Sequence, residues 1–188
     1  MDRKKVGITD VEISGIGLGT GTFGREIDQE KAFEIMDYAV ENGITFFDTA
    51  EAYGGGQAYE IRKQSYGTTD VREKSTEMSS SELIIGRWMK SRGTRKNIEL
   101  CTKISGGKAR PDQIRTALDA SLERLGTDFV DIYKIHSPDV NTPIAESLDA
   151  MGEQVDLGKI KIIGGANYNG EQITEMLDQA KKNGYRRF

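Results

Sequence analysis

Short apolar runs and longer amphipathic stretches alternate along the chain. The apolar runs cover residues 13–19, 44–50, 98–102, 130–135 and 160–166. Each run is short and is bounded by glycine or polar residues, which is typical of buried strands. Between them, apolar residues recur at helical spacing in segments 28–43, 79–89, 111–126, 142–155 and 169–184. The pattern predicts strands and helices in strict alternation, as in α/β proteins.

The predicted strands end at regular intervals. Ends at Thr20, Ala50, Lys103, His136 and Asn167 give intervals of 30, 53, 33 and 31 residues. The long interval contains a polar segment without a sustained apolar face, residues 57–79, which we interpret as a surface insertion; without its 23 residues the interval is 30. Parallel strands joined by crossover helices repeat at about this length. The sequence therefore predicts one α/β domain, residues 1–188, with five βα units.

Two parallel folds fit this repeat: an open, doubly wound sheet, and a (β/α)8 barrel of the TIM type truncated to about five units. In both folds, ligands bind at the carboxyl ends of the strands. The barrel is favoured because polar groups from four different strands converge more readily around a closed ring. Ahead of this fold, weak alternation over residues 5–12, around the turn-like Gly7–Asp10, predicts a short β-hairpin.

Three helix starts carry capping signals. Ser79 and Glu82 have the spacing of a capping box, and Asn169 and Gln172 have the same spacing. Thr142 precedes Pro143, which predicts an N-cap followed by proline at the first helical position.

Composition narrows the classes of partner. The formal net charge is -4, with acids and bases interspersed, so no basic face indicates nucleic acid. No stretch approaches the roughly 18 apolar residues of a membrane helix, and we expect a cytoplasmic protein. Cys101 is the only cysteine, which excludes an internal disulfide framework and predicts a packed thiol in an apolar strand. One histidine and one cysteine provide no familiar metal-ligand spacing.

Three polar residues stand at predicted strand ends, where apolar packing does not require them: Asp48, Lys103 and His136. Tyr53 stands on the loop just beyond Asp48. A phenol in water loses its proton only near pH 10, and a neighbouring ammonium stabilises the phenolate. Asp48 would hold a buried Lys103 in its charged form, and His136 would donate a hydrogen bond or relay a proton. Each residue alone also fits a structural role as an ion pair, a rim aromatic or a core histidine. Together they predict proton delivery to an oxygen that gains negative charge, as carbonyl reduction requires.

The chain resembles the aldo-keto reductase family. The residues that carry the likeness are GLGT at 17–20, DTAEAYG at 48–54, SELIIGR at 81–87, TK at 102–103, LERLGTDFVD at 122–131, His136, GKI at 158–160 and AN at 166–167. They span most of the chain outside the insertion. The resemblance implies an eight-stranded (β/α) barrel that reduces small aldehydes or ketones with a nicotinamide cofactor, usually NADPH; the sequence leaves NADH open.

The resemblance also implies roles for the strand-end residues. Tyr53 would be the general acid, Lys103 and Asp48 its tuning pair, and His136 the group that orients the carbonyl. On the cofactor side, Asn167 would hold the nicotinamide carboxamide. The backbone of Thr20 and Gly21, in the glycine-rich loop after the first strand, would lie close to the cofactor with Asp48.

Three departures from the family pattern set further expectations. Ala166 stands where the family usually has serine, which removes one hydrogen bond of about 0.5 to 1.5 kcal/mol from the nicotinamide contact. The insertion at 57–79 adjoins the site as a lid or an obstruction. The sequence ends after five units, so we expect weak or no activity of the isolated chain and self-association through open sheet edges.

Two alternatives to a reductase remain open from the sequence. The first is a non-catalytic binding or regulatory module, since some relatives serve as channel subunits. The second is an inactive fragment of an aldo-keto reductase, with which the polar insertion and the end of the sequence are both compatible.

Overall fold

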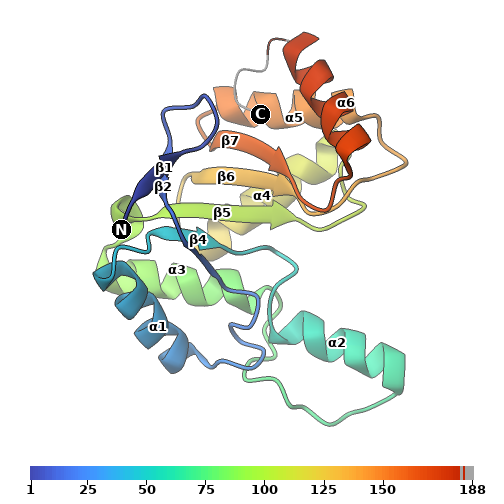
Figure 1. Cartoon of the computed structure of the whole chain (residues 1–188). Helices are drawn as coiled ribbons and strands as arrows, with labels where there is room; N and C mark the ends of the chain where they lie inside the picture. Colours follow the sequence, from blue (N-terminus) through green and yellow to red (C-terminus); the bar gives the residue numbers. More distant parts are fainter. Residues whose placement is uncertain (183, 185–188) are drawn as a thin grey trace.

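The computed structural model describes residues 1–182 and 184 and shows a parallel sheet with helices on one face (Figure 1). The sheet strands are β3 (Gly17–Gly19), β4 (Phe46–Asp48), β5 (Glu99–Ile104), β6 (Val130–Ile135) and β7 (Ile160–Gly165). They are hydrogen-bonded in their sequence order, β3-β4-β5-β6-β7, and every pair is parallel. A doubly wound sheet reverses its strand order at a switch point, and this sheet does not. The order therefore matches part of a barrel, as predicted.

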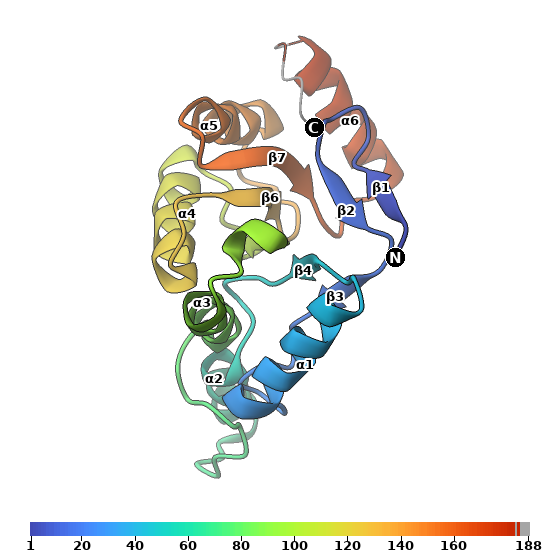
Figure 2. The same cartoon turned by 90° about the vertical axis from the view of Figure 1, so that its left-hand side faces the viewer.

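The helices follow the predicted alternation, with one addition. They are α1 (Gln29–Glu41), α2 (Gly55–Tyr66), α3 (Ser80–Arg92), α4 (Pro111–Leu125), α5 (Ile144–Asp156) and α6 (Gly170–Lys182). Asp28 caps α1 by accepting a hydrogen bond from the backbone N–H of Lys31, and Gly126 ends α4 in the left-handed conformation. In Figure 2, α3, α4 and α5 lie along one side of the strands and the hairpin lies along the other.

Alternate strand residues face the two sides of the sheet. Phe47, Leu100 and Tyr133 are buried in the main core with the helices. Cys101, Ile132 and Ile162 form a smaller cluster with Phe46, Val6 and Val11. The two valines flank the turn of the hairpin formed by β1 (Arg3–Lys5) and β2 (Glu12–Ser14), which confirms the predicted hairpin. Cys101 is fully buried, as predicted, and burial raises the pKa of its thiol to about 11.

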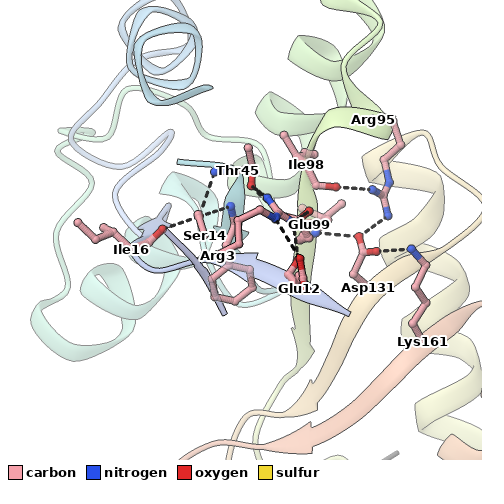
Figure 3. Close-up of polar contacts among 12 residues, drawn as sticks. Arg3, Glu12, Ser14, Ile16, Thr45, Arg95, Ile98, Glu99, Asp131 and Lys161 are labelled. Atoms are coloured by element: carbon pink, nitrogen blue, oxygen red, sulfur yellow. Dashed lines mark hydrogen bonds and ion pairs between the residues drawn. The ribbon is translucent and has the colours of Figure 1, made fainter. Parts of the chain in front are cut away.

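The hairpin is fixed to the amino ends of the strands by charged side chains (Figure 3). Arg3 lies 2.5 Å from the Glu99 carboxylate, and Thr45 donates a hydrogen bond to the second oxygen of that carboxylate at 2.6 Å. Next to this pair, Asp131 bonds Arg95 at 2.8 Å and Lys161 at 2.6 Å. We call the set Arg95, Asp131 and Lys161 the amino-end triad. In Figure 1 the strand arrowheads point away from the hairpin β1–β2, so the carboxyl ends of the strands lie at the opposite edge of the sheet.

Two predictions about regular structure are wrong. The apolar run at 13–19 is not one strand, because it divides at Gly15 into β2 and β3. The Ser14 hydroxyl accepts from the backbone N–H groups of Thr45 and Phe46 at the point where the chain leaves the hairpin for the sheet. The segment interpreted as a polar insertion contains most of a helix, α2, although its residues show no sustained apolar face. This helix projects from the rest of the molecule at the lower right of Figure 1.

The capping predictions met different outcomes. Asn169 and Gln172 exchange reciprocal side-chain-to-backbone bonds at 2.9 Å, so that capping box is confirmed. Ser79 makes no capping bond, because its hydroxyl donates to the carbonyl of Glu51. Glu82 is fully buried and bonds Arg124 and Thr102 instead. Pro143, rather than Thr142, is the N-cap of α5.

The last helix ends close to the limit of the described residues. Gly184, the predicted stop of the last helix, is described and has a φ of 75°, and α6 ends two residues before it. Residues 183 and 185–188 lie outside the described part. Within that part, no helix combines the length and the low polarity that crossing a membrane requires.

Candidate active site

Four predicted residues meet at the carboxyl ends of neighbouring strands. Asp48 is the last residue of β4, Lys103 is the penultimate residue of β5, and His136 follows β6 directly. Because parallel strands end at one edge, the register brings these side chains together. Tyr53 stands on the loop between β4 and α2, where its N–H bonds the carbonyl of Ala50.

Gly54 fixes the loop that carries Tyr53. Its φ of 149° is one that L side chains rarely adopt, and an added Cβ would stand 2.5 Å from the backbone nitrogen of Ser80. Glycine therefore permits the close approach of this loop to the start of α3. The N–H of Ser81 bonds the carbonyl of Tyr53 at 3.3 Å and holds the loop from the other side.

The Lys103 ammonium connects the carboxylate to the phenol. It donates to Asp48, to the carbonyl of Thr49 at 2.8 Å and to the Tyr53 hydroxyl at 3.5 Å. Its nitrogen also lies 4.7 Å from the centre of the Tyr53 ring. An ammonium has three N–H donors, so these three partners fix its position. Lys103 is 4% exposed, which makes its field at the phenol stronger than it would be in water.

His136 lies against the other side of the phenol. The two ring centres are 5.4 Å apart with an interplanar angle of 80°, an edge-to-face contact. Burial lowers the pKa of His136, the positive charge of Lys103 lowers it further, and Asp48 and Glu51 pull it back in part. The imidazole is therefore neutral at pH 7 and donates through one nitrogen.

A pocket of about 420 Å³ opens beside this cluster. Asp48, Tyr53 and Lys103 line it together with the backbone of Gly19, Thr20 and Gly21, and with Gly17 and Phe46. A larger hollow of about 810 Å³ lies at the amino ends, against the hairpin and the amino-end triad. Size alone would favour the larger hollow, but three of the four acids on its wall, Glu12, Glu99 and Asp131, are already ion-paired. The smaller pocket is the better candidate because a phenol and an ammonium face it.

The predicted cofactor residues occupy different positions. The Thr20 side chain is buried: its hydroxyl donates to the carbonyl of Asp48 and accepts from Ser81, so only its backbone is left to border the pocket. Gly21 faces the Tyr53 ring, and a Cβ added at Gly21 would lie 3.9 Å from the nearest ring carbons. Asn167 is exposed, has a φ of 60°, and donates its side-chain amide to the carbonyl of His136 at 2.6 Å. It lies next to the cluster and does not line the pocket.

Sequence reasoning missed one charged residue of the site. Lys134, on β6, lies 3.4 Å from the second carboxylate oxygen of Asp48. Two residues before His136, it was counted as part of an apolar strand. The period of two along a strand puts Lys134 on the same side of the sheet as His136, which is a signal that the sequence contains. The register between β5 and β6 then places Lys134 directly beside Lys103.

Metal chemistry has no support in the described residues, since no three or more histidine, cysteine, aspartate or glutamate side chains there converge as ligands. The structure is a parallel βα fold in which a carboxylate, an ammonium, a phenol and an imidazole meet at the carboxyl edge of the sheet. The profile of the Aldo/keto reductase family matches residues 15–186. The chain belongs to this family.

Individual relatives support the same assignment. The chain is 34% identical to the uncharacterized oxidoreductase YrpG of Bacillus subtilis over 97% of its own length and 54% of the relative's. It is 34% identical to the aldo-keto reductase YhdN of the same organism over 92% of its length and 49% of the relative's. The crystal structure of the thermostable aldo-keto reductase Tm1743 superposes with a TM-score of 0.76 at 31% identity, covering 95% of this chain and 58% of that one. The chain thus spans about half the length of the curated relatives it matches.

Proposed function

We propose that Asp48, Tyr53, Lys103 and His136 form the proton-delivery site of a nicotinamide-dependent carbonyl reductase. The observation that carries the proposal is the position of the Lys103 ammonium, which bonds the Asp48 carboxylate and lies 3.5 Å from the Tyr53 hydroxyl. A phenol beside a fixed cation at the wall of a pocket is suited to give up a proton and to remain as phenolate.

Each residue then has one task. When hydride adds to the carbonyl carbon, a C–H bond forms and negative charge develops on the oxygen. Tyr53 gives its hydroxyl proton to that oxygen, and Lys103 stabilises the phenolate that is left. Asp48 keeps Lys103 charged and oriented, and neutral His136 donates a hydrogen bond to the same oxygen. Solvent returns a proton to Tyr53, and the product is the alcohol.

The pocket wall fits the reactive end of a nicotinamide. An added Cβ at Gly19 would meet nothing within 4 Å, so this glycine leaves open space at the wall, whereas an added Cβ at Gly21 would contact the Tyr53 ring at 3.9 Å. A bound reduced nicotinamide supplies the hydride. Among the described residues, one side-chain N–H of Asn167 bonds the carbonyl of His136. The side-chain oxygen and the second N–H would bind the carboxamide of the nicotinamide. We propose NADPH as the nucleotide, by similarity to the family, with small aldehydes or ketones as substrates.

The test compares two tyrosines under the same conditions. NADPH and NADH oxidation with 4-nitrobenzaldehyde is followed at high protein concentration, after nucleotide binding has been measured by nucleotide fluorescence. Tyr53→Phe should lower the rate by about 10²- to 10⁴-fold, the usual contribution of a positioned proton donor. Tyr66→Phe is the matched control, because Tyr66 is 82% exposed on α2.

The outcomes separate clearly. A rate that falls with Tyr53→Phe and not with Tyr66→Phe supports the proposal, provided that both variants bind nucleotide like the parent chain. A rate that Tyr53→Phe leaves unchanged removes the proposed acid. Failure to bind either nucleotide also contradicts the proposal.

A further inference from the structure

The site contains a second ammonium that the proposed mechanism does not use. Lys134 on β6 lies directly opposite Lys103 on β5 in the parallel register, and both reach the same carboxylate. Like charges opposite each other on neighbouring strands repel. The Asp48 carboxylate offsets this repulsion by accepting from Lys103 through Oδ1 and from Lys134 through Oδ2.

The neighbours of Lys134 leave its charge uncompensated except by Asp48. On the β7 side it passes Gly164, where an added Cβ would lie 3.5 Å from its Cγ. On the β5 side lies Cys101, whose pKa of about 11 keeps the thiol neutral at pH 7. Burial lowers the pKa of Lys134, but interactions with Cys101 and Asp48 raise it overall, so Lys134 is an ammonium at pH 7, where the thiol is neutral and Asp48 provides the counter-charge.

The charges around the phenol therefore do not cancel pairwise. One carboxylate, Asp48, serves two cations, and a carboxylate whose charge is shared neutralises each ammonium less than it would alone. The other acid that acts on this edge is Glu51, which accepts the backbone N–H of Ser105 at 2.7 Å on the far side of the loop. More of the Lys103 charge is consequently available to the Tyr53 oxygen.

We infer that Lys134 is a positioning residue of the active site, which acts through Asp48: it holds one carboxylate oxygen, leaves the other to Lys103, and keeps the site positive where the phenolate forms. The inference rests on the proposed function for its catalytic consequence. Its electrostatic part does not, because it concerns charges that are present whether or not the chain turns over substrate.

The single histidine of the chain reports on this charge directly. His136 gives one imidazole signal in a proton NMR titration of the whole chain, because there is no other histidine. Lys134 lowers the pKa of His136, so Lys134→Met should raise it, and Lys134→Arg should restore the parent value. Lys161→Met removes the same charge at the amino ends of the strands and should leave the titration unchanged. Lys134→Gln is a second neutral variant in case the methionine does not fold.

Kinetics test the catalytic part. With the phenolate less stabilised, Lys134→Met should shift the alkaline decline of the reduction rate to higher pH and lower kcat by about tenfold. KM should change little, because Lys134 does not line the pocket. Lys134→Arg should recover both the pH profile and kcat, which a purely structural role of the residue would not predict.

The two proposals fail in different ways. If His136 titrates in Lys134→Met and Lys134→Gln as in the parent, or if Lys161→Met shifts it equally, the inference about Lys134 is overturned whatever the activity. If the titration shifts as expected while Tyr53→Phe remains fully active, the proposed function fails and the charge coupling stands. A shifted titration with an unchanged pH profile of reduction overturns the catalytic role of Lys134.

Discussion

Two carboxylates of the same sheet each lie between two cations, at opposite ends of the strands. Asp131 bonds Arg95 and Lys161 at the amino ends, and Asp48 bonds Lys103 and Lys134 at the carboxyl ends. The charges are the same in both triads. The side chain of Asp131 is 4% exposed, and that of Asp48 is 28% exposed.

The amino-end triad is closed. Asp131 accepts a third bond, from the backbone N–H of Leu100. Arg95 donates also to the carbonyl of Ile98 (Figure 3) and to that of Phe129. Both cations pack over the Phe129 ring, Arg95 at 4.0 Å and Lys161 at 4.6 Å. Such a cluster stabilises structure, because its donors and acceptors pair with one another and with the backbone.

The carboxyl-end triad is open. Its carboxylate lines a pocket, its second cation lies at 3.4 Å, and a phenol and an imidazole with a lowered pKa adjoin it. The charges themselves therefore do not distinguish a cluster that stabilises structure from one that is suited to chemistry. What distinguishes them is whether every donor and acceptor is satisfied and whether a titratable group stands beside free space.

The largest effect on stability should come from opening the closed triad. Arg95→Met leaves the buried Asp131 with one half-exposed cation, Lys161, and removes the donors to two backbone carbonyls. We expect a loss of about 3 kcal/mol in the free energy of unfolding, measured by urea denaturation. Arg115→Met, which breaks an exposed pair with Glu153, is the matched control and should leave the midpoint nearly unchanged. Equal urea midpoints for the two variants would contradict the description of the amino-end triad as a closed cluster that stabilises the fold.

A smaller effect should follow from removing a cation at the open end. Lys134→Met gives up one 3.4 Å contact with Asp48 but relieves the repulsion between two lysines in register. We expect the free energy of unfolding to change by less than about 1 kcal/mol, in either direction. The same urea measurement checks this. A loss as large as that of Arg95→Met would mean that both triads are structural.

Much of the fold follows from the sequence because its pattern is local. Four of the six helices, α1, α4, α5 and α6, have apolar residues at helical spacing together with capping or terminating residues. α2 has no such pattern, and tertiary contacts stabilise it instead. Gly56 packs on the backbone of Glu77, and the largely buried Glu73 pairs with Arg62 at 2.8 Å. These contacts join segments whose proximity no periodicity reveals.

The site divides in the same way. Asp48, Lys103 and His136 were predictable because parallel strands end at a common edge, and polar residues at apolar strand ends are conspicuous. Lys134 was hidden inside a strand, and only the register between neighbouring strands places it on Asp48. Glu82 shows the reverse error: its spacing from Ser79 suggested a cap, whereas its position against Arg124 and Thr102 depends on helix packing.

The smallest effect we expect is a pH dependence that belongs to the open end alone. His136 is the only histidine, so it is the side chain whose ordinary pKa lies between pH 5 and 8. Burial, and then the charge of Lys103, lower that pKa in the folded state. Below about pH 6.5 the unfolded chain therefore binds a proton that the folded chain accepts only at lower pH. The contribution of His136 to stability is fully present above about pH 6.5 and is lost as the pH falls toward the folded pKa.

Urea midpoints at about pH 7.5, 6.5 and 5.5 measure this slope. In the parent chain the midpoint should decrease over the lower half of the range, and His136→Gln should remove part of the decrease because glutamine does not titrate. Arg95→Met should lower every midpoint and keep the parent's slope, since it leaves His136 and its neighbours at the carboxyl ends unchanged. If His136→Gln keeps the full slope, the dependence arises from carboxylates elsewhere, and the open end loses the titrating group that separates it from the closed one.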